Sequence, residues 1–257
     1  MPKRLQCNIS SVTYLNNDTR KIVLDLPKGD TLKFKAGQYL EIILPNNRCP
    51  FSIASAPHNN NSLELHIRPT PQSKDSHDIE QLLSHSKKLC IEAPLGNCFI
   101  EDPPKESLLL IAASTGITQM KCIFEHLKHI GHVGDIFLYW GVLSDSDLYL
   151  DELCKTWESE NKNFRYVPVV SEPETSPYWE GRTGLVSDAV LQDFENLRDL
   201  LIYVSGGPNM VYATREAFMP RGLVAKNMLS DMFSYSCLLY TSPSPRDLST
   251  SRMPSSA

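Results

Sequence analysis

The chain has 257 residues, of which 41% are hydrophobic and 21% charged, a composition that supports a packed core rather than a disordered chain. Its 25 Lys and Arg against 30 Asp and Glu give a net charge of -5, so no basic surplus exists to neutralise nucleic-acid phosphates. The longest purely apolar run, residues 108–113, is far shorter than the about 20 residues that cross a bilayer, and the first seven residues hold no signal-like apolar stretch. We therefore expect a cytoplasmic protein that binds neither nucleic acid nor a membrane.

The first 103 residues predict an all-β domain. Turns rich in Pro, Gly and Asn separate short segments that are β-branched or alternate in polarity, and these segments predict strands over residues 21–26, 38–44, 51–56 and 63–67. One helix-like stretch, residues 78–86, follows them. Short strands at this spacing are typical of a small antiparallel barrel or sandwich.

From the Pro103-Pro104 pair onward, the pattern alternates between strands and helices. Strands are predicted over residues 108–112, 135–141, 164–170 and 200–204, and helices over residues 118–130, 147–158, 187–193 and 208–219. This alternation implies βαβ units and a parallel sheet. We expect residues 1–103 to form the β domain and residues 104–235 to form a nucleotide-binding type of α/β domain.

The last segment has a composition unlike the rest of the chain. Residues 241–257 contain six Ser, three Pro and two Thr, and such a segment buries too little apolar surface to offset its ordering entropy. The string from Cys237 onward also resembles translated sequencing-adapter read-through. We therefore interpret residues 236–257 as a disordered or non-native tail.

Neither the cysteines nor the histidines predict a metal site. The seven cysteines have irregular spacings without a Cys-x-x-Cys motif, so free, mostly buried thiols are expected rather than zinc ligands or an iron–sulfur cluster. His126, His129 and His132 recur every three residues, but no carboxylate or cysteine completes a ligand set beside them. A serine hydrolase also has little support, because no Gly-x-Ser-x-Gly motif occurs.

The segment of residues 48–55, Arg-Cys-Pro-Phe-Ser-Ile-Ala-Ser, has two interpretations. As a flavin platform, Pro50 and Phe51 would form an apolar wall, and the Ser52 hydroxyl would offer a hydrogen bond near flavin N5. Taken alone, such a segment is more often an ordinary β-strand that contains serines.

Three loops next to predicted strands have residue types that suit a nucleotide. Residues 113–117 end the first parallel strand and open a helix, a place where ligands bind and where a helix N-terminus favours phosphate. Residues 205–210 repeat this arrangement with two glycines and a proline in the first helical turn. In the loop of residues 181–184, Arg182 would grip a phosphate bidentately. The simpler interpretations are a strand–helix turn for the first two loops and a solvated side chain for Arg182.

Taken in chain order, these segments resemble the NAD(P)H-flavin reductases of the ferredoxin-NADP reductase superfamily. The resemblance covers about residues 5–235, and the most similar members are the single-component bacterial flavin reductases, including those that serve luciferases. Ten motifs carry it in the expected order, which makes it specific: Phe34–Tyr39, Pro50–Ser55, Leu63–Ile67, Ala93–Gly96, Leu109–Gly116, Leu138–Gly141, Pro168–Val170, Gly181–Gly184, Tyr203–Gly206 and Ser230–Tyr235.

The resemblance implies a six-stranded antiparallel flavin barrel followed by a Rossmann-like, doubly wound parallel α/β domain for NADH or NADPH. Hydride would pass from nicotinamide C4 to N5 of FMN, FAD or riboflavin, with catalytic roles for Ser52, Asp231 and Ser205. The residues that it places at the flavin are Cys49, Pro50, Phe51, Ser52, Ile53, His66, Ile67, Phe233 and Tyr235. Those that it places at the nicotinamide nucleotide are Ala113, Ser114, Thr115, Gly116, Ile117, Arg182, Gly206, Gly207, Pro208 and Met210.

The chain departs from the family pattern at three places. The usual Arg before Pro-Phe-Ser is Cys49, and Arg48 is displaced by one residue, which on a strand points a side chain to the opposite face and puts tight binding of a phosphorylated flavin in question. The usual Gly-Gly-Thr-Gly is replaced at residues 113–116 by Ala-Ser-Thr-Gly, whose two added side chains would crowd the dinucleotide. The cysteine often found beside the nicotinamide is Ser205.

Three functions stay open on the sequence. The first is a reductase that treats flavin as a loosely held substrate and passes reduced flavin to another acceptor, such as a flavin-dependent monooxygenase. The second is an electron-transfer subunit with bound FAD that serves an oxygenase or another partner. The third is a non-catalytic module that binds flavin or nucleotide, which the two lost glycines favour.

Overall fold

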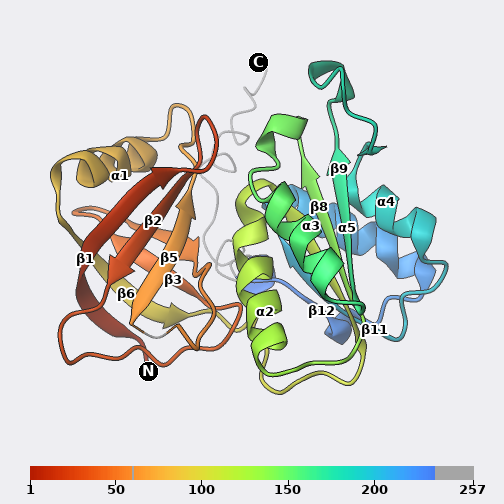
Figure 1. Ribbon diagram of the computed structural model, residues 1–257, viewed down its shortest axis with the longest axis horizontal. Helices are drawn as coiled ribbons and strands as arrows, with labels where there is room; N and C mark the ends of the chain where they lie inside the picture. The colour runs from red at the N-terminus through yellow and green to blue at the C-terminus, as the bar shows by residue number, and fades with distance from the viewer. Residues whose placement is uncertain (60, 235–257) are drawn as a thin grey trace, which may run out of the picture.

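Two six-stranded sheets form the computed structural model, which describes residues 1–59 and 61–234 (Figure 1). The first sheet is antiparallel and the second is parallel with helices on both faces, so the predicted fold class is confirmed. The predicted tail, residues 236–257, lies outside the described residues. No helix within residues 1–59 and 61–234 is both long and apolar enough to cross a membrane.

The first sheet has the strand order β4-β3-β6-β1-β2-β5. Its outer strands meet where the Ala54 amide donates to the Glu64 carbonyl at 2.8 Å, which curls the sheet into a barrel around apolar side chains. The elements of this half are β1 (Lys3–Tyr14), β2 (Arg20–Asp25), β3 (Tyr39–Ile43), β4 (Arg48–Ser52), β5 (Ser62–Ile67), α1 (Lys74–His85) and β6 (Lys88–Leu95).

The second sheet has the strand order β10-β9-β8-β7-β11-β12. The predicted domain boundary at Pro103-Pro104 falls in the connection between β6 and β7. The strands of this half are β7 (Ser107–Ala113), β8 (Ile136–Val142), β9 (Phe164–Val170), β10 (Arg182–Thr183), β11 (Leu200–Ser205) and β12 (Met228–Leu229). Its α-helices are α2 (Ile117–His129), α3 (Asp151–Glu160), α4 (Val186–Asp193) and α5 (Pro208–Phe218).

Alternation along β7 explains why helices cover both faces of this sheet. Leu108 and Leu110 point into a core shared with α2, α3 and the barrel, whereas Leu109 and Ile111 point into a second core with α4 and α5. Because side chains alternate across a strand, an apolar run of this kind is buried on both sides. Helix α2 lies between the barrel and the parallel sheet (Figure 1), and its buried residues belong to the first of these cores, which includes the barrel interior.

Several predicted elements differ from the structure in their bounds. The predicted helix over residues 147–158 begins only at Asp151, because residues 145–147 form a separate 3-10 turn capped by Ser144. The predicted loop of residues 181–184 contains the short strand β10, which pairs with β9. The expectation of free thiols holds for the six described cysteines, five of which are buried.

Candidate functional site

Three neighbouring cavities share lining residues: two lie between the barrel and the parallel sheet, and the third is lined by the α/β half alone. Residues of β4, β11 and the segment after β12 line the inner cavity: Tyr39, Pro50, Phe51, Ser52, Gln119, Val204, Ser205, Gly206, Ser230, Asp231 and Met232. The outer cavity shares five of these and adds His66, Arg68, Thr70, Ala113, Ser114, Thr115, Gly116, Thr118 and Gly207. The edge cavity shares Ala113 and Ser114 with the outer one and adds Gly141, Val142, Leu143, Ser171, Gly184, Leu185, Val186 and Met210.

The inner cavity brings together three polar residues that are far apart in the sequence. Ser52 ends β4 of the barrel, Ser205 ends β11 of the parallel sheet, and Asp231 follows β12. Pro50 and Phe51 form an apolar wall next to Ser52, and Phe51 packs on the shared core. The cavity therefore combines two hydroxyls and a carboxylate with an apolar surface that suits a flat ring.

Burial gives the Asp231 carboxyl an unusual affinity for protons. Its pKa is raised from 3.8 to about 6, chiefly by burial, while hydrogen bonds from the Cys98 and Asn97 backbone and from Gln119 act in the opposite direction. The Gln119 amide lies 3.1 Å from Asp231 Oδ2 and also donates to the Gly37 carbonyl at 2.7 Å. Gln119 thus links helix α2, the barrel and the carboxyl group in one buried contact.

The loop after β7 is shaped by the close approach of β11. A Cβ atom at Gly116 would lie 2.2 Å from the Ser205 carbonyl oxygen, so only glycine fits this position. Ser114 takes a positive φ of 51°, a conformation that glycine adopts without strain. Its carbonyl accepts a hydrogen bond from the Trp140 indole at 2.9 Å. At Gly206, a Cβ would lie 3.0 Å from the Ala113 Cβ, so this glycine leaves room for the alanine side chain.

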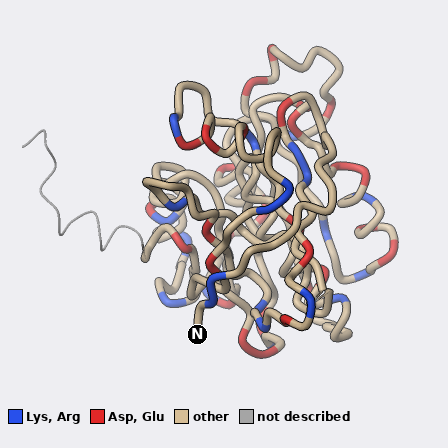
Figure 2. Tube along the Cα trace, turned by 90° about the vertical axis from the view of Figure 1, so that its left-hand side faces the viewer, with Lys and Arg blue, Asp and Glu red and all other residues tan. Residues whose placement is uncertain are grey.

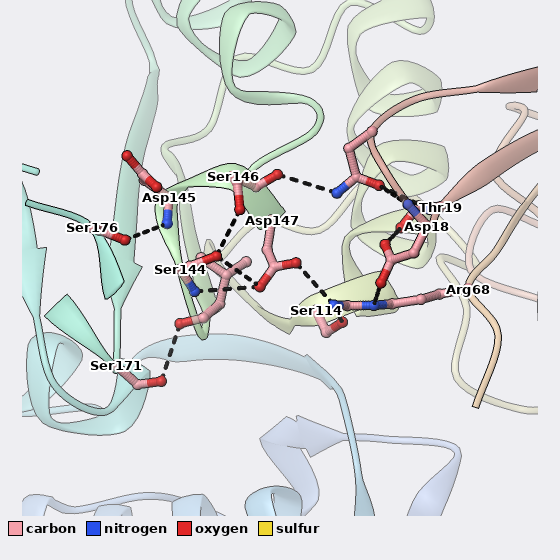
Figure 3. Close-up of polar contacts among 12 residues, drawn as sticks. Asp18, Thr19, Arg68, Ser114, Ser144, Asp145, Ser146, Asp147, Ser171 and Ser176 are labelled. Atoms are coloured by element: carbon pink, nitrogen blue, oxygen red, sulfur yellow. Dashed lines mark hydrogen bonds and ion pairs between the residues drawn. The ribbon is translucent and has the colours of Figure 1, made fainter. Parts of the chain in front are cut away.

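Arg68 connects the barrel to the parallel-sheet half beside the outer cavity. Its guanidinium contacts Asp18 Oδ2 at 2.7 Å, Asp147 Oδ1 at 2.9 Å and the Ser114 hydroxyl at 3.2 Å (Figure 3). Asn16, in the β1–β2 turn near Asp18, adds a hydrogen bond from its amide to the Ser146 carbonyl at 3.2 Å. We call these contacts the Arg68 latch.

A buried charged network lies behind the outer cavity. The His66 Nε2 atom is 2.7 Å from the Glu64 carboxylate, and Nδ1 is 3.3 Å from the Tyr149 hydroxyl. The Lys121 ammonium group, on α2, lies 3.4 Å from Glu64 and 3.0 Å from Glu125. Burial acts to raise the Glu64 pKa, but the His66 hydrogen bond and the Lys121 charge outweigh it and lower the pKa to about 2. Burial is also the main cause of the lowered pKa of His66.

Most of the predicted site residues that the structure describes line these cavities, and seven do not. Cys49, Ile53 and Ile67 are buried in the barrel core. Arg182 instead binds Asp193 at 2.5 Å and the Ala189 carbonyl at 3.1 Å, so it holds helix α4. The others that do not line the cavities are Ile117, which is buried at the start of α2, Pro208, which is the first residue of α5, and Phe233, which packs on Tyr212 and Arg215. Tyr235 lies outside the described residues.

The structure also places residues at the cleft that the sequence did not predict. Arg68 directly follows the alternating segment 63–67, and a lone cation at the end of a predicted strand was its only signal. Gln119 was detectable as a polar residue on the buried face of a predicted helix. The walls of the edge cavity come from ordinary apolar residues that carry no motif.

Two known domain families match the chain. The oxidoreductase FAD-binding domain matches residues 6–100, and the oxidoreductase NAD-binding domain matches residues 110–216. A probable flavin reductase of Photobacterium leiognathi is 33% identical over 239 residues, covering 89% of this chain and 98% of the relative. The reductase component 1 of a terephthalate 1,2-dioxygenase from a Comamonas species is 32% identical, covering 91% and 69%.

A solved structure supports the same fold. A cytochrome P450 reductase from Amycolatopsis superposes with a TM-score of 0.81 at 27% sequence identity, and the similarity covers 90% of this chain and 69% of that one. The inner cavity lies where the segments matched by the two domain families face each other, since Ser52 belongs to the first and Ser205 to the second.

Proposed function

The chain belongs to the ferredoxin-NADP reductase family of oxidoreductases, which join an FAD-binding to an NAD-binding domain, and we propose that it reduces a flavin with NADH or NADPH. The observation that carries the proposal is the meeting of Ser52, Ser205 and Asp231 in one cavity between the two family domains. We assign residues 1–103 to the flavin domain and residues 104–235 to the nicotinamide nucleotide domain.

The residues at the cleft fit a flavin ring better than its phosphate. Pro50 and Phe51 offer an apolar face, and the Ser52 hydroxyl lies at its border. Arg48 is not among the residues that line the three cavities, and its guanidinium pairs with Glu41 at 3.4 Å and Glu92 at 3.1 Å on neighbouring strands. These contacts support a flavin that is held by its ring and exchanges with solvent, so FMN, FAD and riboflavin are all proposed substrates.

Among the described residues that line the three cavities, Arg68 is the only Lys or Arg, and its charge is already shared. Asp18 and Asp147 both lie within 3 Å of its guanidinium. A flavin phosphate would have to compete with these two carboxylates for the same donors. The latch therefore adds support for flavin as a diffusible substrate rather than a permanently bound group.

The nicotinamide and flavin rings supply the redox chemistry, in which hydride passes from nicotinamide C4 to flavin N5. We assign Ser52 to a hydrogen bond at the reacting edge of the flavin. Asp231, when ionised, stabilises the positive charge that develops on the nicotinamide as hydride leaves. Ser205 and Gly206 would hold the nicotinamide, and the close approach of Gly116 to Ser205 keeps these two residues next to the loop after β7.

The test is flavin-dependent oxidation of the nicotinamide by the purified full-length chain. NADH and NADPH absorbance is followed with and without added FMN, FAD and riboflavin. We expect oxidation that requires added flavin and saturates with its concentration. Absence of any flavin-dependent oxidation by either nucleotide overturns the proposed function.

A second candidate is an electron-transfer reductase with bound FAD that serves an oxygenase. The similarity to the terephthalate dioxygenase reductase component favours it. A yellow protein that carries one flavin per chain through purification, and that oxidises NADH without added flavin, would support this function over the first. Reduction of an added protein acceptor would then identify the partner, whereas turnover of any kind dismisses a purely binding role.

A further inference from the structure

Gln119 is a buried polar residue at the junction of the two halves. It lies in the first turn of α2, and only 2% of its surface is exposed. Its side-chain amide donates to two carbonyls of the barrel half, Gly37 at 2.7 Å and Cys98 at 3.2 Å. The same nitrogen lies 3.1 Å from Asp231 Oδ2. Because a primary amide has two hydrogens, these three acceptors use its whole donor capacity.

The inner cavity offers the Asp231 carboxylate no positive partner. Figure 2 shows Lys and Arg interspersed with Asp and Glu along the chain, but among the described residues that line this cavity only Asp231 carries a charge. A half-buried carboxylate without a cation beside it keeps its charge through hydrogen-bond donors. The donors here are the Gln119 amide and the backbone amides of Asn97 and Cys98.

Two titratable side chains of the barrel half face Asp231. Burial raises the pKa of the Cys98 thiol well above its usual value, so this thiol stays neutral. The Tyr39 ring is the second, since a Cβ atom at Gly96 would lie 2.7 Å from the ring and 2.9 Å from Asp231 Oδ1. Neither a thiol nor a phenol can bring a positive charge. The groups that face the cavity from α2 and from the end of β11 are an amide and a hydroxyl.

From this geometry we infer that Gln119 is a positioning residue, which orients the Asp231 carboxylate in the inner cavity and stabilises its charged form. The inference rests on the proposed function, in which ionised Asp231 stabilises the nicotinamide as hydride leaves. The two barrel carbonyls hold the Gln119 amide in place and direct its donors toward Asp231. The ionisation of Asp231 therefore depends on the contact between the barrel and α2.

The experiment follows the Asp231 carboxyl directly and through kcat. Carbon-13 NMR of the full-length chain, labelled at its aspartate carboxyl carbons, measures the pH midpoint without flavin or nucleotide, and Asp231→Asn identifies the signal. Gln119→Met keeps the side-chain length and removes the amide, so the midpoint of Asp231 should rise by about one pH unit. With FMN and the nucleotide that is oxidised, kcat should then fall to about half of the wild-type value at pH 7 and recover at pH 9.

A second variant and a wild-type measurement make the test independent of the folding of Gln119→Met. Gln119→Glu retains the shape of the side chain and places a second carboxyl beside Asp231, so the midpoint should rise further. In the wild-type chain, the nitrogen-15 signal of the Gln119 side-chain amide should shift with the same pH midpoint as Asp231. An amide signal that does not respond to this titration contradicts the inference.

The matched control is Gln38→Met. The Gln38 amide donates to the Gly96 carbonyl at 3.1 Å in the same part of the barrel, but Gln38 does not line the inner cavity. Its replacement should leave the Asp231 midpoint and the pH profile unchanged. An unaltered midpoint in a folded Gln119 variant, or a loss of kcat that is equal at every pH, overturns the inference. A shifted midpoint in a chain without flavin-dependent oxidation would instead overturn the proposed function and leave the link between Gln119 and Asp231 intact.

Discussion

Ser52 is the residue whose replacement most directly tests the flavin contact. It ends β4 and lines both the inner and the outer cavity, and no hydrogen bond holds its side chain elsewhere in the described residues. Removing one oriented donor near a developing charge costs roughly 10²–10³-fold in kcat in enzymes where this has been measured. We expect Ser52→Ala to lower kcat in this range with little change in thermal stability.

An exposed serine on the same barrel serves as the control for Ser52. Ser10→Ala, on β1, removes the same hydroxyl from a strand that does not reach the cleft. Its kcat should equal that of the wild-type chain. If Ser52→Ala turns over as fast as this control, the hydroxyl has no part in hydride transfer.

The raised pKa of Asp231 predicts how kcat depends on pH. Its pKa of about 6 means that the carboxyl is protonated at lower pH and ionised above it. Only the ionised form stabilises the positive charge left on the nicotinamide, so kcat should rise as pH increases through about 6. Asp231→Asn should remove this step and lower kcat on the alkaline side. If kcat of Asp231→Asn still rises as pH increases through about 6, a group other than Asp231 causes the pH dependence.

At the level of single residues, the sequence could predict the types of side chain in the site but only part of their arrangement. The alternation of β4 places Cys49 inside the barrel, and the preceding residue, Arg48, turns outward to two glutamates. The partner of Arg182, Asp193, lies at the far end of the next helix, and no local pattern indicates that contact. Such pairings depend on tertiary packing, which a single sequence does not show.

Among the structural elements, the β1–β2 turn and the loop after β8 are joined by the contacts of the Arg68 latch. Arg68 is partly exposed, with 29% of its side-chain surface accessible, so its ion pairs are screened by solvent. We expect Arg68→Ala to change stability little. It also removes the hydrogen bond from Arg68 to the hydroxyl of Ser114, a residue with positive φ in the loop after β7. We therefore expect KM for the nicotinamide nucleotide to rise by a severalfold larger factor than the factor by which kcat falls.

Arg48→Ala is a matched control for the latch. Arg48 also pairs with two carboxylates, but all three residues belong to the barrel and none of these contacts reaches the α/β half. Kinetic constants are measured for both variants, along with their thermal midpoints. An equal effect of the two replacements on KM would show that the latch does not position the nucleotide loop.

Prediction of the elements succeeded where hydrophobic periodicity is strong. The buried strand β7 and the amphipathic helix α2 fall within one or two residues of their predicted bounds. Strand β1 was not predicted, because most of its residues are exposed or half-buried and its pattern is correspondingly weak. Strand β12 has only two residues, and its pairing with β11 depends on a long-range contact. Local patterns therefore find the core elements and miss those that are held by their neighbours.

For the whole molecule, the decisive feature is that the two sheets share one core through α2. Ile117, Ile123 and Phe124 belong to the same cluster as the barrel interior. On the same helix, Lys121 reaches across to Glu64 of β5 and to the Ala54 carbonyl. Breaking a buried ion pair by removing one partner leaves an uncompensated charge. The charges behind the cleft therefore join the two halves, so their titration should affect the stability of both.

Glu64 makes this coupling measurable as a function of pH. Its pKa is about 2 in the folded chain against 4.5 ordinarily, so the folded state binds fewer protons than the unfolded chain within that window. The stability that Glu64 contributes is fully present above about pH 4.5 and is lost as pH falls towards 2. Glu64→Gln should therefore have a lower free energy of unfolding than the wild-type chain at neutral pH, and this difference should vanish on acidification.

Glu160→Gln is the control, because it removes an exposed partner of Lys128. Its free energy of unfolding should differ little from that of the wild-type chain. Denaturant unfolding across this pH range measures both, and a gap for Glu64→Gln that stays constant with pH would show that the carboxylate does not link the two halves.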